Sequence, residues 1–319
     1  MDVTKSHRLP AAFFGVLAGS LFLLGYFFLW RPPTYEVFPK IIEIPKGTTI
    51  RQAADILEDK DLISSPFSFM VGVKLFSRTG VKAGTYRFDH PIRLFTAARR
   101  LSSGDSRIPP VRITFPEGLS VKEMAAICAE KLPLCKKSEF IILGMPFEGY
   151  LFPDTYDFSA GAEAKTVIEA MRKEFDSKIT SLDKEIKASG RPISQIIIMA
   201  SLLEEEARTL ETRRMISGIL WKRLQIGMPL QVDAVFPYII GKDTFSLTSE
   251  DLAYDSPYNT YLHVGFPPGP IASPGLEAIK AAITPITSAY LYYLSDREGN
   301  VYYSKTHEEH IAKKLKYLN

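Results

Sequence analysis

Hydrophobic positions in residues 196–224 recur with the period of an α-helix, and this pattern predicts one long helix. On a helical wheel of about 100° per residue, an apolar stripe collects six side chains: Ile196, Met199, Ala200, Leu203, Ala207 and Leu210. Three consecutive glutamates fall within this pattern. Glu205 lies opposite the stripe and is expected to be solvated, whereas Glu204 and Glu206 lie at its two edges.

Glu206 has the more apolar surroundings of the two edge positions, because aliphatic side chains lie one or two turns before it and Leu210 follows one turn later. A carboxyl group half-buried against such side chains has a raised pKa, since burial disfavours its charged form. It can then donate a proton near neutral pH. A solvated helix face is the alternative interpretation, because glutamate is a strong helix former.

The apolar pattern is continuous in residues 11–30, which contain no charged residue. A run of 20 residues is long enough for one bilayer span, and aromatic side chains gather at its far end, as in an interfacial belt. Basic residues in the tail at 1–10 favour a cytoplasmic N-terminus. A cleaved signal peptide is the alternative, but the run ends in FFLWRPP, which lacks the small residues of a cleavage site. We therefore expect an uncleaved single-pass anchor.

A strand, a Pro-x-Gly turn and a capped amphipathic helix occur twice, in a first copy (residues 39–63) and a second copy (residues 111–134). Equivalent positions lie 71 residues apart: Pro45 and Pro116, Gly47 and Gly118, Thr49 and Ser120, Ile50 and Val121, Ala54 and Ala125, Ile56 and Ile127. Another strand, turn and helix are predicted at 81–105. Such an internal repeat resembles LysM-like units, which bind glycan chains. A plain spacer domain is the alternative.

Residues 147–158, FEGYLFPDTYDF, combine many aromatic side chains with Glu148 and Asp154. Aromatic faces beside carboxylates suit sugar rings, which offer apolar C–H faces and hydroxyl groups. An ordinary hinge with core aromatics is the alternative. Further along, residues 228–242 predict a loop followed by a strand that carries Gln231 and Asp233.

A loop within residues 256–285 contains four prolines and three glycines in close succession, which excludes regular structure. Four polar or aromatic residues stand beside it: Tyr258, Asn259, Thr260 and Tyr261. Rigid loops of this kind often form the walls of a site. After it, residues 289–304 predict a hairpin with a DREGN turn. A basic helix with His307 and His310 closes the chain, and histidines in such a place are usually surface or capping residues.

The length and composition of the chain exclude several classes of function. A chain of 319 residues predicts two or more globular units. Its net charge is only +3 and no basic tract with interleaved aromatics is present, so nucleic acid is not an expected partner. Neither a phosphate-binding glycine loop nor a metal-type cysteine spacing occurs, and we expect no cofactor. The two cysteines, Cys128 and Cys135, either pair or remain core thiols.

Several ordered blocks together resemble the YceG-like (MltG) family of bacterial endolytic murein transglycosylases. They are EGYLFPDTY, MASLLEEEA, KRLQIGMPLQVD, SPYNTY, GFPPGPIASPG and YSKTHEEH. The resemblance covers the architecture from the expected anchor onward, and its motifs are specific mainly from Glu148. The family's catalytic glutamate is the last acidic residue of its ASxxExE block, which is Glu206 here. The helical wheel alone leaves Glu204 open.

The resemblance implies non-hydrolytic cleavage of peptidoglycan glycan strands between N-acetylmuramic acid and N-acetylglucosamine, leaving a 1,6-anhydro end. The substrate's own 6-hydroxyl is then the nucleophile, so one carboxyl serves as acid and then as base. Candidate substrate-binding residues are Gln231, Asp233, Tyr258, Asn259 and Tyr261, together with Glu148 and Asp154. His310 matches a family position without an assigned role. The family also implies work beside the peptidoglycan synthases of the elongation machinery at the bacterial inner membrane, ending growing strands.

Two positions depart from the family pattern. Val235 stands where a threonine is common, which removes a hydroxyl that could contact substrate. Phe266 stands where leucine is usual. Neither change affects the expected role of Glu206.

We therefore expect an α+β protein with a tail at 1–10, an anchor at 11–30, a LysM-like region at 32–140 and a catalytic domain at 145–319. Two other functions stay open. A non-catalytic peptidoglycan-binding scaffold would tolerate glutamine at position 206. A hydrolase would need a second carboxylate, for which Asp233 is the close candidate.

Overall fold

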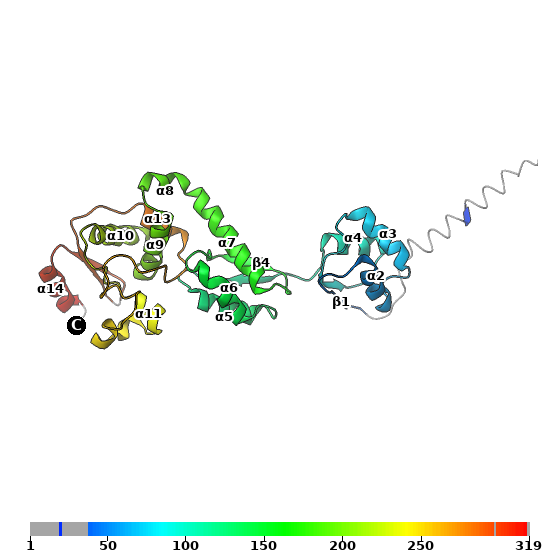
Figure 1. Cartoon of the computed structure of the whole chain (residues 1–319), viewed down its shortest axis with the longest axis horizontal. Coiled ribbons are helices and arrows are strands. Elements are labelled where there is room, and N and C mark those ends of the chain that lie inside the picture. The colour runs from blue at the N-terminus through cyan, green and yellow to red at the C-terminus, as the bar shows by residue number, and fades with distance from the viewer. Residues whose placement is uncertain (1–18, 21–37, 297, 318–319) are drawn as a thin grey trace, which may run out of the picture. The chain divides into compact units, whose positions relative to one another are not determined.

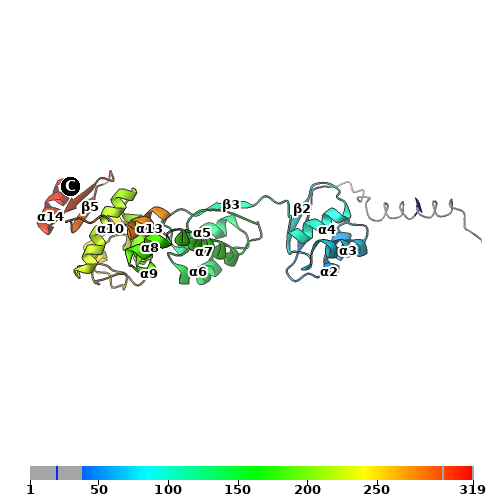
Figure 2. The same cartoon turned by 90° about the horizontal axis from the view of Figure 1, so that it is seen from above.

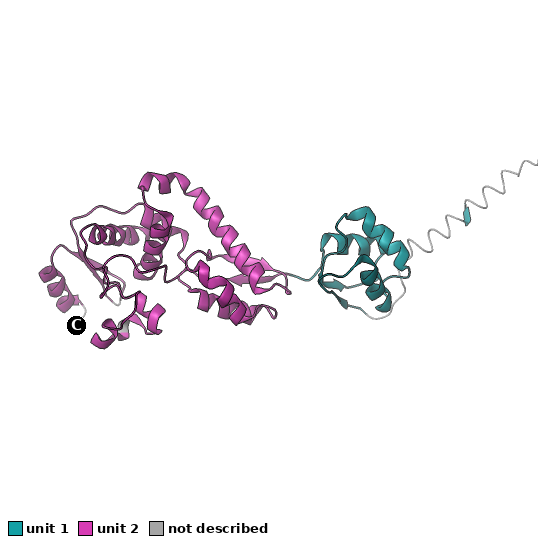
Figure 3. Cartoon of the chain, in the orientation of Figure 1, with its two compact units in different colours: residues 1–109 teal, residues 110–319 magenta. Residues whose placement is uncertain are grey.

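The computed structural model describes residues 19–20, 38–296 and 298–317 and confirms the expected α+β class (Figure 1). Helices are joined to three two-stranded antiparallel sheets within this described part of the chain. The chain divides into two compact units, unit 1 (residues 1–109) and unit 2 (residues 110–319) (Figure 3). Unit 2 thus holds the second copy of the repeat as well as residues 145–319.

None of the described helices is long and apolar enough to cross a bilayer. The tail at 1–10 and the anchor at 11–30 lie outside the described residues, apart from Gly19 and Ser20. The anchor therefore stays a prediction from the sequence.

Unit 1 is a strand–helix–helix–strand arrangement followed by one more helix. Its elements are β1 (Lys40–Ile44), α2 (Ile50–Asp59), α3 (Pro66–Phe76), β2 (Gly84–Phe88) and α4 (Leu94–Ser103). Strands β1 and β2 are antiparallel, with Lys40 opposite Phe88. Alternate strand residues and one face of each helix enclose a single apolar core. The strand and helix expected at 81–105 are confirmed as β2 and α4.

Helix α2 begins as the sequence predicts. Thr49 is its N-cap: its hydroxyl accepts a hydrogen bond from the Gln52 amide at 3.2 Å, and Gln52 Oε1 accepts one from the Thr49 amide at 2.9 Å. Such a capping box satisfies backbone donors that the first helical turn leaves free. Gly47 in the preceding turn has a φ of 81°, a conformation that glycine adopts without strain.

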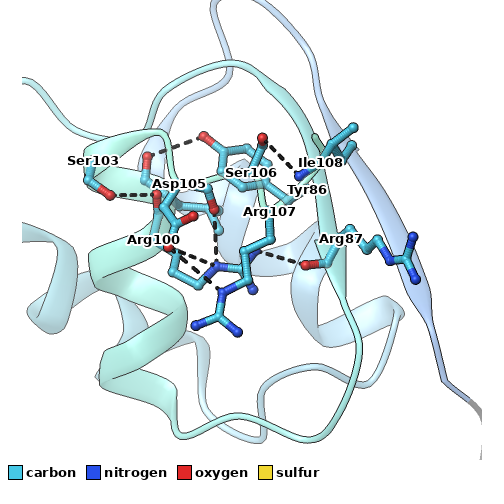
Figure 4. Close-up of polar contacts among 9 residues, drawn as sticks. Tyr86, Arg87, Arg100, Ser103, Asp105, Ser106, Arg107 and Ile108 are labelled. Carbon is cyan, nitrogen blue, oxygen red and sulfur yellow. Dashed lines mark hydrogen bonds and ion pairs between the residues drawn. The ribbon is translucent and has the colours of Figure 1, made fainter. Parts of the chain in front are cut away.

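A buried arginine forms hydrogen bonds that hold the last residues of unit 1 in place (Figure 4). Arg100 on α4 is 2% exposed. Its guanidinium donates to the carbonyl of Asp105 at 3.0 Å and to the carbonyl of Arg87 at 2.8 Å, and it lies 4.4 Å from the ring of Phe88. The Arg87 amide in turn donates to the carbonyl of Ser106 at 2.8 Å. The segment after α4 is therefore held against β2.

Unit 2 opens with the second copy, which has the same strand–helix–helix–strand order. Its elements are β3 (Val111–Thr114), α5 (Val121–Lys131), α6 (Lys137–Gly144), the short 3-10 helix η2 (Met145–Phe147), β4 (Thr155–Phe158) and α7 (Ala164–Ser181). Ser120 and Glu123 form the capping box of α5. The structure pairs Cys128 with Cys135 in a disulfide, which decides the question the sequence left open.

The rest of unit 2 surrounds a second, larger core. Its elements are α8 (Asp183–Ser189), α9 (Ile193–Glu206), α10 (Leu210–Gln225), α11 (Val235–Ile240), η3 (Thr244–Ser246), α12 (Ser249–Leu252), α13 (Leu276–Ile283), β5 (Tyr292–Ser295), β6 (Val301–Ser304) and α14 (His307–Tyr317). Helices α9, α10 and α13 pack together, as Figures 1 and 2 both show. Helix α14 packs on the β5–β6 hairpin. The predicted hairpin and final helix are confirmed.

The strand expected in residues 228–242 is wrong. Residues 235–240 form helix α11 rather than a strand. The run VFPYII is rich in β-branched and aromatic residues, which favour strands, but Val235 and Phe236 are buried in the core of unit 2 on one helical turn. Tertiary packing therefore overrides the local preference. In contrast, residues 256–275 have no regular secondary structure, as predicted.

Candidate active site

The three glutamates lie at the end of a helix and not within a long one, which corrects the prediction of one helix over 196–224. Helix α9 ends at Glu206, and Ala207 has an extended backbone with φ −154° and ψ 150°. Helix α10 then starts behind Thr209, whose hydroxyl accepts from the Thr212 amide. Because the C-terminal end of a helix disfavours negative charge, the position favours protonated carboxyl groups.

Glu204 is a structural residue. Its carboxylate makes a short charged hydrogen bond with Arg213 and accepts the Gly275 amide at 2.8 Å. The two side chains are only 5% and 7% exposed. Arg213 also donates to the carbonyl of Ala207 at 2.7 Å, so it holds the break between α9 and α10. These contacts occupy the carboxylate of Glu204, which leaves Glu206 as the stronger candidate.

Glu205 is exposed on the other side of the helix, as the wheel predicts. Its carboxylate nevertheless lies against Gly118 in the turn of the second copy. Partial burial of the carboxyl group and the neighbouring Glu204 charge raise the pKa of Glu205 to about 7. A raised pKa alone therefore does not distinguish Glu206 from its neighbour.

Glu206 is distinguished by its surroundings. Burial raises the pKa of its carboxyl group to about 7, and the nearby Asp233 charge adds to this rise. The Tyr293 hydroxyl and the Ala234 amide donate hydrogen bonds to it, which partly offset the effect. Burial and the Glu206 charge hold the pKa of Tyr293 well above its usual range, so this hydroxyl stays a donor. The group can therefore give and take a proton near neutral pH.

Two predicted blocks meet beside Glu206. The Tyr261 hydroxyl donates a short hydrogen bond to Asp233. The Val232 amide donates to the Thr260 hydroxyl at 2.9 Å, and the Gln231 amide donates to the Thr260 carbonyl at 3.1 Å. The loop after α10 and the loop before the prolines are thus fastened side by side. Of the predicted substrate-binding residues, Asp233 and Tyr261 are the two with electrostatic contact to Glu206.

Asn259 has a structural part in this arrangement. It is fully buried, and its side-chain amide donates to the carbonyls of Leu252 and Tyr254 at 3.0 and 2.9 Å, while its carbonyl oxygen accepts from the Tyr261 amide at 2.9 Å. These bonds shape the turn that presents Tyr261. Gln231 is exposed and has a φ of 52°.

Glu148 and Tyr258 belong to a separate group. The Glu148 carboxylate is buried and accepts the Val121 amide at 3.0 Å, at the start of α5. Burial raises the pKa of Glu148 to about 7. The ring of Tyr258 lies 5.2 Å from the ring of Tyr238, whose pKa is raised by burial and by the Glu148 charge. Asp154 is exposed and accepts the amide of the next residue at 2.7 Å.

His310 lies on α14 with its ring stacked on Tyr292 at 5.4 Å. Its Nδ1 is buried without a hydrogen-bond partner, and burial together with the Lys314 and Arg223 charges lowers its pKa. It is therefore half-buried rather than a surface cap, which corrects that expectation. His307 is exposed.

The proline-rich loop is held against the other motifs. An ideal Cβ on Gly149, whose φ is 78°, would lie 2.4 Å from Pro270 Cβ, so only glycine allows this approach. The Ile271 amide donates to the Ser201 hydroxyl of α9 at 3.2 Å. Ser273 pairs with the second copy: its carbonyl accepts the Gly118 amide at 3.0 Å, and its amide donates to the Leu119 carbonyl at 2.9 Å.

Comparison with known proteins gives the family. The YceG-like family matches residues 42–316. This chain belongs to the YceG-like family. A relative named endolytic murein transglycosylase from Bacillus subtilis (strain 168) is 33% identical over 305 residues, which cover 87% of this chain and 84% of the relative. One of the same name from Streptococcus pneumoniae (strain D39) is 28% identical and covers 87% of this chain, which spans 58% of that protein.

A crystal structure of a yceG-like protein from Listeria monocytogenes is also similar. It aligns with a TM-score of 0.60 and 32% identity, covering 88% of this chain and all of that one. The fold described above is thus shared with another protein of the YceG-like family.

Sequence reasoning missed three residues of this YceG-like site. The Tyr293 hydroxyl donates a hydrogen bond to Glu206, and the Lys314 charge lowers the pKa of Asp233. Arg223 lies 5.0 Å from the ring of Tyr292 and donates to the Leu291 carbonyl at 2.7 Å. Arg223 stands within the block KRLQIGMPLQVD, which was a signal for it. Tyr293 and Lys314 come from the hairpin and final helix, and no spacing rule connects them with Glu206. Among the described residues, no cluster of three or more His, Cys, Asp or Glu could hold a metal ion.

Proposed function

We propose that this chain cleaves peptidoglycan glycan strands between N-acetylmuramic acid and N-acetylglucosamine without water, leaving 1,6-anhydro ends. It is a lytic transglycosylase, a lyase, on the strength of relatives that are named endolytic murein transglycosylases. The observation that carries the proposal is Glu206, a carboxyl group with a pKa of about 7 at the end of α9.

Glu206 serves first as acid and then as base. In its neutral form it gives its proton to the glycosidic oxygen as the bond from that oxygen to C1 breaks. The 6-hydroxyl oxygen of the same muramic acid closes on C1, and its proton returns to the Glu206 carboxylate. The acid form is thereby restored, and no water is consumed. Tyr293 stabilises the charged form between the two steps by its hydrogen bond.

Hydrolysis is the second candidate, because Asp233 lies close enough to Glu206 to raise its pKa. A hydrolase needs a second carboxylate to activate water or to attack the sugar. The carboxylate of Asp233 already accepts a short hydrogen bond from the Tyr261 hydroxyl, which occupies its Oδ1 and lowers its basicity. We therefore favour the transglycosylase reaction. Family membership argues against a scaffold without catalysis.

We extend the proposal to location and role. The apolar run at 11–30 anchors the chain in the bacterial inner membrane, with the N-terminus cytoplasmic and both units outside the cytoplasm. The LysM-like repeat region adds contact with glycan, and the enzyme acts beside peptidoglycan synthases and ends nascent strands. The apolar run and the similarity to the named relatives support these steps.

The test is digestion of purified peptidoglycan by the full chain in detergent, with products read by mass spectrometry. We expect anhydro ends from the parent and none from Glu206→Gln. Glu205→Gln is the matched control, because its carboxyl group has a similar pKa but lies on the exposed side of α9. Reducing ends from the parent would show a hydrolase instead. Full activity of Glu206→Gln would remove Glu206 from the mechanism.

A further inference from the structure

Helix α3 of unit 1 has an apolar face that nothing in the described chain covers. Phe67, Val71 and Leu75 are 72%, 41% and 71% exposed. They are four residues apart, so they form one outward stripe about 12 Å long on the helix. The opposite face packs inward through Phe69, Gly72 and Val73, so the outward stripe is not needed for the core. Gly72 itself allows the close contact with α4, because a Cβ there would lie 3.0 Å from Ala98.

The charges around this stripe have one sign. Helix α3 contains no acidic residue, and it carries Lys74 on the exposed side with Arg78 just beyond its end. In residues 38–109 there are 12 lysines and arginines against seven acidic residues, a net charge of +5. Residues 110–319 have 24 against 27, a net charge of −3. An exposed apolar helix face with basic neighbours suits the surface of an anionic bilayer.

The chain before unit 1 places a bilayer within reach. The apolar run proposed as the anchor ends at Trp30, and only seven residues separate it from Phe38, the first described residue of the folded unit. Seven extended residues span at most about 25 Å, which is less than the diameter of a small domain. Unit 1 therefore stays next to the bilayer whenever the anchor is inserted. This step rests on the proposed function.

We propose that α3 lies on the outer surface of the same membrane, with Phe67, Val71 and Leu75 inserted among the lipids and Lys74 and Arg78 at the headgroups. Docking would fix the orientation of unit 1 instead of leaving it on a free tether. The surface is an interaction site in addition to the catalytic one.

Depth measurement on the full chain in vesicles of phosphatidylglycerol and phosphatidylethanolamine tests this proposal. Cys128 and Cys135 form a disulfide and do not react with a thiol-specific label. A nitroxide attached to the Val71→Cys variant is therefore the single label. We expect this label to lose contact with a water-soluble nickel chelate and to gain contact with dissolved oxygen. Ile142→Cys is the matched control: it is the equivalent position of the second copy on α6, is 73% exposed, and should stay accessible to the chelate.

The double variant Phe67→Asp/Leu75→Asp should return the Val71 label to water, and it should still fold because both side chains are exposed. Flotation of the chain with the vesicles reports the anchor separately. A floating chain whose Val71 label stays in water overturns the docking and leaves the anchor intact. A chain that does not float overturns both. Protection of Val71 that rises with protein concentration, without oxygen contact, would identify a second copy as the partner and also overturn the proposal.

Discussion

The two copies of the repeat fold by the same local rules and differ in what lies against their Pro-x-Gly turns. Gly47 and Gly118 both have a φ of 81°, and each turn leads into a helix with a capping box. Nothing lies within 4 Å of an added Cβ at Gly47, whereas at Gly118 the carboxylate of Glu205 would be 2.4 Å away. The first turn borders an open groove of about 500 Å³, which is lined by polar and apolar residues of α2 and the turn.

The difference shows how a common module becomes part of the candidate active site. The second turn is held by two backbone hydrogen bonds to Ser273 and by contact with the end of α9. Glu204, through Gly275, secures the same proline-rich loop. The capping boxes and the Pro-x-Gly turns are local features of the same type in the two copies. Long-range contacts alone decide that the second copy supports the Glu206 site.

Removing Arg213 should have the largest effect, and only on unit 2. Arg213→Ala leaves Glu204 buried without its charged partner, which typically destabilises a protein by about 3–5 kcal/mol. It also frees the carbonyl of Ala207 at the helix break. Trp221 lies in the core of unit 2, so its fluorescence during urea unfolding measures the loss.

Arg112→Ala is the control for this prediction. Arg112 pairs with Asp157 on the surface, where the two side chains are 72% and 44% exposed. Such a pair contributes about 1 kcal/mol or less. Equal losses for the two variants would mean that the buried pair does not hold the helix break.

The contrast between the copies also marks what the sequence could and could not predict. The capped helix starts, the Pro-x-Gly turns and the final hairpin depend on neighbouring residues, and they were predicted. The break in the helix at Ala207 was not predicted, because residues 207–209 contain no glycine or proline. The break is held by Arg213 from the next helix. Tyr293 was missed because 86 residues separate it from Glu206 in the sequence. Contacts of this kind follow from the tertiary fold.

The pH dependence of unit 2 should be the second largest effect. The folded-state pKa of Glu206 is about 7, above its ordinary value of 4.5, so the folded state binds this proton more tightly. The contribution of this proton to the free energy of unfolding is therefore complete below about pH 4.5 and is lost as the pH rises through 7. At 1.36 kcal/mol per pKa unit, the loss is up to about 3 kcal/mol. Glu206→Gln should be more stable than the parent at pH 8 and equally stable at pH 4. Urea unfolding followed by Trp221 checks this, and a difference that is the same at both pH values would contradict it.

Substituting the two turn glycines compares the copies directly. Gly47→Ala and Gly118→Ala both place a side chain in the left-handed region, at about 1–2 kcal/mol each. Only at Gly118 would the added Cβ also push on the Glu205 carboxylate, beside the backbone hydrogen bond from the Gly118 amide to Ser273. We expect similar losses of stability, measured by hydrogen exchange in each unit, but a loss of peptidoglycan cleavage in Gly118→Ala alone. Loss of cleavage in both variants would show that the first copy also supports the site.

The helix caps should show the smallest difference between the copies. Thr49→Ala removes the hydroxyl that accepts the Gln52 amide in the first turn of α2, and such a change typically destabilises by about 1 kcal/mol. Ser120→Ala removes the same cap from α5, but Glu148 still accepts the Val121 amide there. Because one acceptor remains, we expect about half the loss. Hydrogen exchange of the first-turn amides in α2 and α5 measures the two effects side by side. If Ser120→Ala destabilised α5 as much as Thr49→Ala destabilises α2, then Glu148 would not share in capping α5. The hydrogen bond from the Val121 amide would then not explain why the Glu148 carboxyl group is buried.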